Sequence, residues 1–207
     1  MLQSKGPAQA RTWTSTSATK ERILDAAVQV FGARGFTAAT MAEIVERSGV
    51  SVGSIYHHFG GKAEVFNAIW ENFGALLRRQ VEEGIESARA AGETDPFELF
   101  IVGIRRYLRL IWENRSRARV IAMGDTPPGF DAQRRRRSRA GGDSELAILE
   151  LGPSRRDRLF GDFLIAMRNE TTIALFGIAT EAEAESLIDE TERCFRRLRG
   201  DGAAGPE

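Results

Sequence analysis

The spacing of apolar residues predicts a helix in the first part of the chain. From Thr19 onward, apolar positions recur at intervals of three and four residues, which is typical of a helix with one buried face: Ile23, Ala27, Val30 and Phe31. Gly35 ends this pattern. Residues 1–18 are polar, rich in Ser and Thr and free of acidic residues, so we expect a flexible arm there.

Two short helices joined by a tight turn are predicted next. Thr40 is followed three residues later by Glu43, and this hydroxyl–carboxylate spacing is that of a capping box at a helix N-terminus. That helix ends at Ser48-Gly49, and Ser51 can cap a third helix of about two turns that stops at Gly60-Gly61. This arrangement predicts a helix-turn-helix.

Longer helical patterns fill the rest of the chain, so the sequence predicts an all-α fold. Asp95-Pro96 reads as an N-cap followed by a proline in the first helical position, and a break is expected at Gly141-Gly142. The alternating segment 147–151 is left unassigned, and residues 201–207 are expected to be a disordered tail. Helices are expected from Lys62, from Asp95 to about Trp112, and over about 115–123, 154–176 and 181–199.

Charge is balanced overall but unevenly distributed. The chain has 29 basic and 29 acidic residues, yet residues 1–62 carry seven basic and four acidic ones. The N-terminal part is therefore net positive, which favours an approach to a polyanion such as DNA, and two such heads in a dimer act together on one duplex.

Several classes of protein are disfavoured by composition. A single cysteine excludes a disulfide framework and a multi-cysteine metal site, and no run of 18 apolar residues predicts a membrane span. The N-terminus has no apolar segment typical of a secretory signal, so we expect a cytoplasmic protein without membrane association. The sequence contains no arrangement of Ser, His and Asp, no phosphate loop and no metal-ligand cluster that would support catalysis. We therefore expect no enzymatic activity, metal or cofactor.

The third predicted helix carries side chains suited to reading a DNA groove. Gly53 and Ser54 are small enough for close backbone approach, and Val52 can meet a thymine methyl group. Tyr56 and His57 offer hydrogen-bonding tips. Outside this helix, we expect Thr40, at a helix N-terminus, and Lys62, at the start of the next helix, to contact phosphates.

The segment from Lys20 to Phe66 resembles the DNA-binding domain of the tetracycline-repressor (TetR) family, above all in its SVGSIYHHF sequence and the following GKAE. This resemblance implies an all-α homodimer with a three-helix DNA-binding head over residues 19–65. It implies a divergent ligand-binding and dimerisation domain over residues 66–200. Applied to this sequence, it places Thr40, Tyr56 and Lys62 on phosphates, and puts five residues at or near base edges: Ser51, Val52, Gly53, Ser54 and His57.

Other interpretations of these residues stay open at the level of sequence. Tyr56 is also compatible with a core position, although Ile55 and Phe59 already supply an inward stripe. A metal pair at His57-His58 is disfavoured, because neighbours on a helix point about 100° apart. The arginines at 134–137 and 139 fit a solvated face, a second nucleic-acid patch or an anionic-ligand site, and Cys194 fits a small core residue better than a redox sensor.

The overall expectation is a ligand-responsive transcriptional regulator, favoured as a repressor, that binds a palindromic operator as a homodimer and is released by a small-molecule effector. An activator, or an all-α ligand-binding or adaptor protein without operator binding, is the alternative. The last two helices are expected to form the dimer interface. The candidate effector contacts, each also compatible with a plain core role, are Trp70, Phe73, Phe100, Ile104, Tyr107, Ile111, Met123, Phe163 and Met167.

Overall fold

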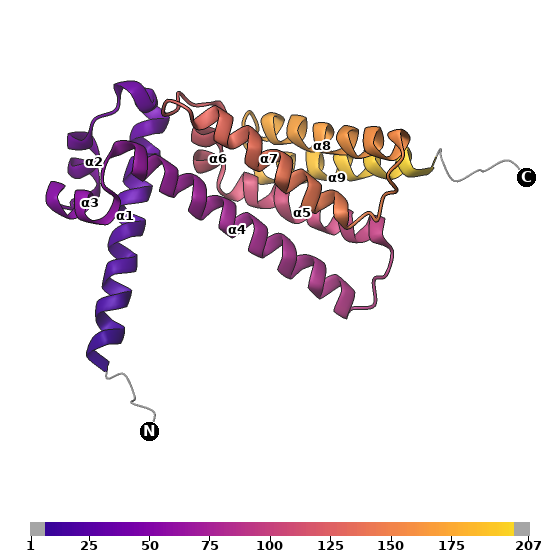
Figure 1. Ribbon diagram of the computed structural model, residues 1–207, viewed down its shortest axis with the longest axis horizontal. Coiled ribbons are helices and arrows are strands. Elements are labelled where there is room, and N and C mark those ends of the chain that lie inside the picture. Colours follow the sequence, from indigo (N-terminus) through magenta and orange to yellow (C-terminus); the bar gives the residue numbers. More distant parts are fainter. Residues whose placement is uncertain (1–6, 201–207) are drawn as a thin grey trace, which may run out of the picture. The chain divides into compact units, whose positions relative to one another are not determined.

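The computed structural model describes residues 7–200, and the side chains of residues 16–137 and 146–199 (Figure 1). This part of the chain forms helices and contains no strand, as the sequence predicts. The helices are α1 (Pro7–Ala38), α2 (Met41–Ser48), α3 (Val52–Phe59), α4 (Lys62–Ala90), α5 (Pro96–Glu113), α6 (Arg115–Met123), α7 (Phe130–Ala147), α8 (Arg155–Leu175) and α9 (Glu181–Gly200).

The helices belong to two compact units. The head unit comprises Met1–Phe73 and Ser116–Pro128, and the body unit comprises Gly74–Arg115 and Gly129–Glu207. α4 runs without interruption through residue 65, where the sequence placed a domain boundary. The head unit also takes in nearly all of α6, which the sequence assigned to the C-terminal domain.

Helix α1 is longer than the sequence predicted. It begins at Pro7, so residues 7–18 are helical where we expected a flexible arm. Proline suits the first turn of a helix, and no Gly or Pro follows it before Gly32, so nothing in that stretch breaks the hydrogen-bond ladder. Gly35 does end the regular helix, because its φ of 75° lies in the left-handed region that glycine adopts without steric cost.

The predicted helix-turn-helix is present in the head unit. Thr40 caps α2 in a capping box with Glu43, and Ser51 caps α3 by accepting a hydrogen bond from the Ser54 amide. Between the two helices, Gly49 has a φ of 63° and its amide donates to the carbonyl of Val45. This left-handed cap ends α2 and turns the chain into α3.

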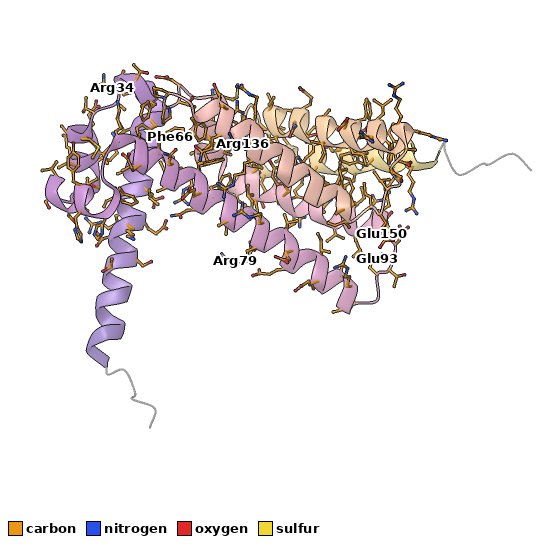
Figure 2. All side chains as sticks on the ribbon, in the orientation of Figure 1. Arg34, Phe66, Arg79, Glu93, Arg136 and Glu150 are labelled. Carbon is orange, nitrogen blue, oxygen red and sulfur yellow. The ribbon has the colours of Figure 1, made fainter. Side chains whose placement is uncertain are left out.

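Aromatic rings form the centre of the head unit. Phe31 and Phe36 of α1 and Phe66 of α4 lie with ring centroids 5.6 to 5.7 Å apart, and Phe66 is fully buried. Figure 2 shows Phe66 where α4 begins, and Arg34 at the outer edge of the same unit. Ile44 of α2 and Ile55 of α3 are also fully buried. The apolar face of each short helix is therefore anchored in this core.

In the body unit, α5 packs against α8 and α9. Ten of the 18 residues of α5 are buried, which fits its high share of apolar residues. Arg105 of α5 forms ion pairs with Glu185, Asp189 and Glu192 of α9 at 2.6 to 2.8 Å. One guanidinium thus holds three carboxylates along one face of α9 and fixes the register of the two helices.

Helix α7 differs from the prediction. It continues through Gly141-Gly142, where the sequence suggested a break. Glycine within a helix costs about 1 kcal/mol relative to alanine, which weakens a helix without forbidding it. The predicted disordered tail, residues 201–207, lies outside the described residues.

Candidate nucleic-acid interface

Helix α3 has one buried and one exposed face. Ile55 is fully buried, whereas the side chains of Val52 and Tyr56 are 52% and 50% exposed. Tyr56 therefore does not belong to the core, which was the alternative role for it. Gly53 and His57 are exposed as well. The face of α3 that points away from the core presents the small, apolar and hydrogen-bonding groups suited to the edges of base pairs.

Gly53 has free space beside it. A Cβ atom built at this position meets no other atom of the described structure within 4 Å. The protein itself therefore does not require glycine here. The open surface at Gly53 would let a binding partner come close to the backbone of α3.

Thr40 lies exposed at the start of α2. Its Oγ1 accepts a hydrogen bond from the Glu43 amide at 3.3 Å and donates to the Glu43 carboxylate at 3.0 Å. Hydrogen bonds from the Thr40 backbone and side chain hold the pKa of Glu43 below its usual value, and Arg34 pairs with the same carboxylate at 3.0 Å. The capping box thus keeps Thr40 in place at the helix N-terminus, where a phosphate is electrostatically favoured.

The two histidines of α3 differ in exposure. His57 is exposed, whereas His58 is half-buried between the His57 ring, 5.4 Å away, and the Phe59 ring, 6.4 Å away. Among the residues whose side chains are described, no group of three or more His, Cys, Asp or Glu is placed to hold a metal ion.

Lys62 has partners within the protein. Its ammonium donates to the carbonyls of Phe36, Thr37 and Ala39 at 2.7, 3.2 and 2.7 Å. An ammonium group has three N–H donors, so these bonds use all of them. The sequence predicted a phosphate contact for Lys62, and in this conformation no donor is left for one.

Two residues that no sequence pattern singles out support the site. Arg22 of α1 donates to the carbonyl of Ser48 at 2.7 Å and so holds the last turn of α2. Asp125, in the loop after α6, accepts hydrogen bonds from the Phe36 and Thr37 amides near the end of α1. These pairs are 26 and about 90 residues apart in sequence, and no local pattern reveals such contacts.

Three of the candidate effector residues line one hollow. Phe100, Ile104 and Tyr107 line a hollow in the body unit with a volume of about 10 Å³, room for about one water molecule. The other lining residues are Val81, Ile85, Gly103 and Ile148. Ile111 and Met167 belong to the same unit but do not line this hollow.

The remaining candidates are divided between the two units. Trp70, Phe73 and Met123 belong to the head unit, where Trp70 and Phe73 are buried and Met123 is exposed. Phe163, on α8, is 54% exposed. The sequence thus identified three of the residues lining the hollow, but helical periodicity does not distinguish them from ordinary core residues.

The arginine run that begins at Arg134 and the single cysteine were the other features singled out from the sequence. Arg134 pairs with Asp131 in an exposed contact of 3.1 Å, and Cys194 is a free, half-buried thiol. No described helix is long and apolar enough to cross a membrane.

The geometry of α2 and α3 defines a helix-turn-helix DNA-binding domain. Residues 23–69 match the family model of bacterial regulatory proteins of the tetR family. The N-terminal part of the chain thus carries a DNA-binding domain of the tetR-family type.

Curated relatives match in the N-terminal part. The transcriptional regulator SrpR of Pseudomonas putida is 42% identical over 59 residues, 28% of each chain. The probable acrEF/envCD operon repressor of Escherichia coli K12 is 31% identical over 100 residues, 46% of this chain and 43% of the relative. The alignments thus span less than half of the length of these relatives.

Solved structures match over most of the chain. MexZ of Pseudomonas aeruginosa, described as a key repressor responsible for antibiotic resistance, has a TM-score of 0.71 at 20% identity, covering 91% of this chain and 96% of MexZ. FadR of Bacillus subtilis in complex with stearoyl-CoA has a TM-score of 0.68 at 18% identity, covering 84% and 96%. At these identities the likeness shows a shared fold.

Proposed function

We propose that the protein is a transcriptional repressor that binds a palindromic operator as a homodimer and releases it when a small molecule binds. The observation that carries this proposal is the exposed face of α3, anchored through Ile55 within a TetR-family head. In a helix-turn-helix protein, the second helix enters the major groove and the first crosses the backbone. The protein then acts in the cytoplasm, where the bacterial chromosome lies.

The proposed DNA contacts follow from exposure. Val52, Gly53 and Ser54, in the N-terminal half of α3, and His57, in its C-terminal half, face base edges together with the cap Ser51. Thr40 and Tyr56 contact phosphates of the DNA backbone on either side of the major groove that α3 enters. Phosphate contacts position the protein and base-edge contacts specify sequence, so substitution of Tyr56 should affect all sequences alike and substitution of His57 should change the preferred sequence.

The test of operator binding is a selection of duplexes from a random library, followed by a gel shift on the enriched sequence. A dimeric repressor should enrich an inverted repeat with half-sites one helical turn apart, because two α3 helices on one face of B-DNA must lie about 34–36 Å apart. Enrichment of no sequence, with binding as weak as to a random duplex, would contradict the proposal.

Support for the homodimer comes from apolar side chains left exposed in the body unit. Leu159 and Phe163 of α8 are 68% and 54% exposed and lie one helical turn apart, and Ile173 and Leu198 are exposed as well. A stripe of this kind is typical of a protein–protein contact. Pairing α8 and α9 with those of a second copy buries it in a four-helix interface.

We therefore expect Phe163→Arg to produce a monomer, because it places a charge in the centre of the proposed apolar contact. Sedimentation should show half the wild-type mass, and operator affinity should fall because one head makes half of the contacts. Gln133→Arg, which adds the same charge at an exposed position of α7 outside the proposed α8–α9 interface, is the matched control and should stay dimeric. A Phe163→Arg protein that sediments as a dimer would exclude this interface.

The proposed effector site is the apolar hollow lined by Phe100, Ile104 and Tyr107. Its volume of about 10 Å³ requires side chains to move apart before a ligand enters. α4 contributes Val81 and Ile85 to this hollow, and its first residues belong to the head unit. An effector that binds a shifted α4 more tightly lowers operator affinity, and a coupling of about 1–3 kcal/mol corresponds to a 5- to 150-fold change.

A further inference from the structure

The end of α1 and the turn into α2, residues 36–39, are held mainly by groups from outside this segment, although the Ala39 amide donates to the Gly35 carbonyl at 3.3 Å. Gly35 leaves the helical conformation, so the backbone groups of residues 36–39 cannot all bond within α1. Buried or half-buried backbone groups in native proteins are nearly always paired, and here their partners come from two distant parts of the head unit.

The donors of this segment are bound by Asp125, in the loop after α6. The Thr37 amide donates to Asp125 Oδ2 at 2.6 Å, and the Phe36 amide donates to the Asp125 carbonyl at 3.3 Å. A Cβ atom at Gly35 would lie 3.2 Å from the Asp125 Cβ, so the close approach also depends on glycine. Hydrogen bonds from the Thr37 side chain and backbone hold the pKa of Asp125 below its usual value.

The acceptors of the same segment are bound by Lys62, the first residue of α4. Its ammonium donates hydrogen bonds to the carbonyls of Phe36, Thr37 and Ala39, and it lies 4.6 Å from the centroid of the Phe36 ring. The positive charge of Lys62 also lowers the pKa of Asp125. An anion and a cation thus hold the donors and the acceptors of one short segment.

Helix α6 itself is fixed on α1. Arg117 pairs with Asp25 at 2.5 Å and with Glu21 at 3.4 Å, both on α1. The loop that carries Asp125 therefore starts from a helix that is attached to α1 and ends at Pro128, where the chain leaves the head unit.

We propose that Asp125 and Lys62 form a clip on residues 35–39 that sets the direction in which α2 leaves α1, and that Asp125 is thereby a positioning residue for DNA recognition by α3. The inference rests on the proposed DNA-binding function. α2 and α3 share the core of the head, so a change in the direction of α2 carries Thr40 and the exposed face of α3 with it. Displacement of the loop after α6 releases the clip and lowers the affinity for the operator.

The first test asks whether substitution of Asp125 weakens or strengthens DNA binding. Removal of an acidic side chain from a DNA-binding protein ordinarily strengthens binding to all sequences, because it reduces repulsion of the phosphates. The clip predicts the opposite for the specific site: Asp125→Ala should bind the selected operator about tenfold more weakly. Its binding to a random duplex should stay unchanged or become slightly stronger.

Asp131→Ala is the matched control, since Asp131 is exposed, lies six residues further on and loses the same charge. It should leave the ratio of specific to random binding unchanged. Asp125→Asn keeps the shape of the side chain and should lower the same ratio by a smaller factor. This variant keeps the test valid if Asp125→Ala unfolds, because general unfolding lowers both kinds of binding.

The second readout is hydrogen exchange of the Phe36 and Thr37 amides in the full-length protein without DNA. Exchange should be faster in the Asp125 variants and unchanged in Asp131→Ala. Faster exchange with an unchanged binding ratio, or a lower ratio with unchanged exchange, would overturn the proposal. A wild-type protein that prefers no sequence refutes the proposed function instead, and the wild-type arm of the assay shows this separately.

The role of Lys62 is tested by the salt dependence of binding. If its ammonium stays on the three carbonyls, Lys62→Met should weaken operator binding without changing the slope of log K against log salt. A phosphate contact from Lys62 of each protomer predicts that the slope becomes shallower by about 1.8, which is about 0.9 for each lost contact. A change of this size would show that Lys62 contacts DNA and is not part of the clip.

Discussion

Gly53→Glu should abolish operator binding while leaving the fold at least as stable as before. The position is exposed on α3, and an added Cβ atom meets nothing within 4 Å in the described structure. Glycine is about 1 kcal/mol less favourable than alanine inside a helix, and an acidic residue in the first turn interacts favourably with the helix dipole. The melting temperature should therefore stay the same or rise slightly.

The loss of binding has two causes. A glutamate side chain fills the space that lets the backbone of α3 approach base edges, and its charge meets the phosphates. Juxtaposed like charges cost several kcal/mol, so we expect affinity to fall more than about 100-fold. A gel shift titration together with thermal unfolding measures both effects.

Two controls separate these causes. Gly53→Ala adds a methyl group without charge and should give a smaller loss. Gln133→Glu adds the same charge at an exposed position of the body unit and should leave affinity nearly unchanged. If Gly53→Glu bound the operator as tightly as the wild type, α3 would not be the reading helix.

Phe66→Ala should give the largest loss of stability. Phe66 is fully buried and its ring lies within 5.7 Å of both Phe31 and Phe36. Replacing a buried phenylalanine by alanine costs about 3–5 kcal/mol, through lost apolar burial and the cavity that remains. A typical domain is stable by only about 5–15 kcal/mol, so most of the stability of the head unit is at stake.

Denaturant unfolding monitored by circular dichroism measures this loss, and operator binding should disappear with it. Phe66→Leu retains most of the volume and should cost clearly less. A cost below about 1 kcal/mol for Phe66→Ala would mean that the aromatic cluster does not hold the head together.

The fold was predictable where local chemistry determines it. The capping box at Thr40, the cap at Ser51 and the Asp95-Pro96 start of α5 are all present, because each depends on residues within one helical turn. The N-terminal extent of α1 and the continuity of α7 were not predictable in the same way. Composition suggested an arm at the start of α1 and a break within α7. The residues in these two segments lower the helix propensity, but none of them forbids a helix.

The site was partly predictable for a related reason. The exposed face of α3 follows from helical periodicity once Ile55 is assigned to the core. The partners of Lys62 and the role of Asp125 are tertiary contacts across 23 to 88 residues, and periodicity carries no information about them. The proposed effector site was harder still to predict, since a residue that lines an apolar hollow has the same character as any core residue.

The most direct test of the account is protection of guanine N7 atoms in the selected operator against methylation by bound wild-type protein. N7 lies in the major groove, so protection reports the groove that α3 enters. We expect two protected patches centred about 10 base pairs apart, on one face of the duplex, and both should be absent with Gly53→Glu. Binding of the operator without major-groove protection, or with protection that persists in Gly53→Glu, would contradict the central claim.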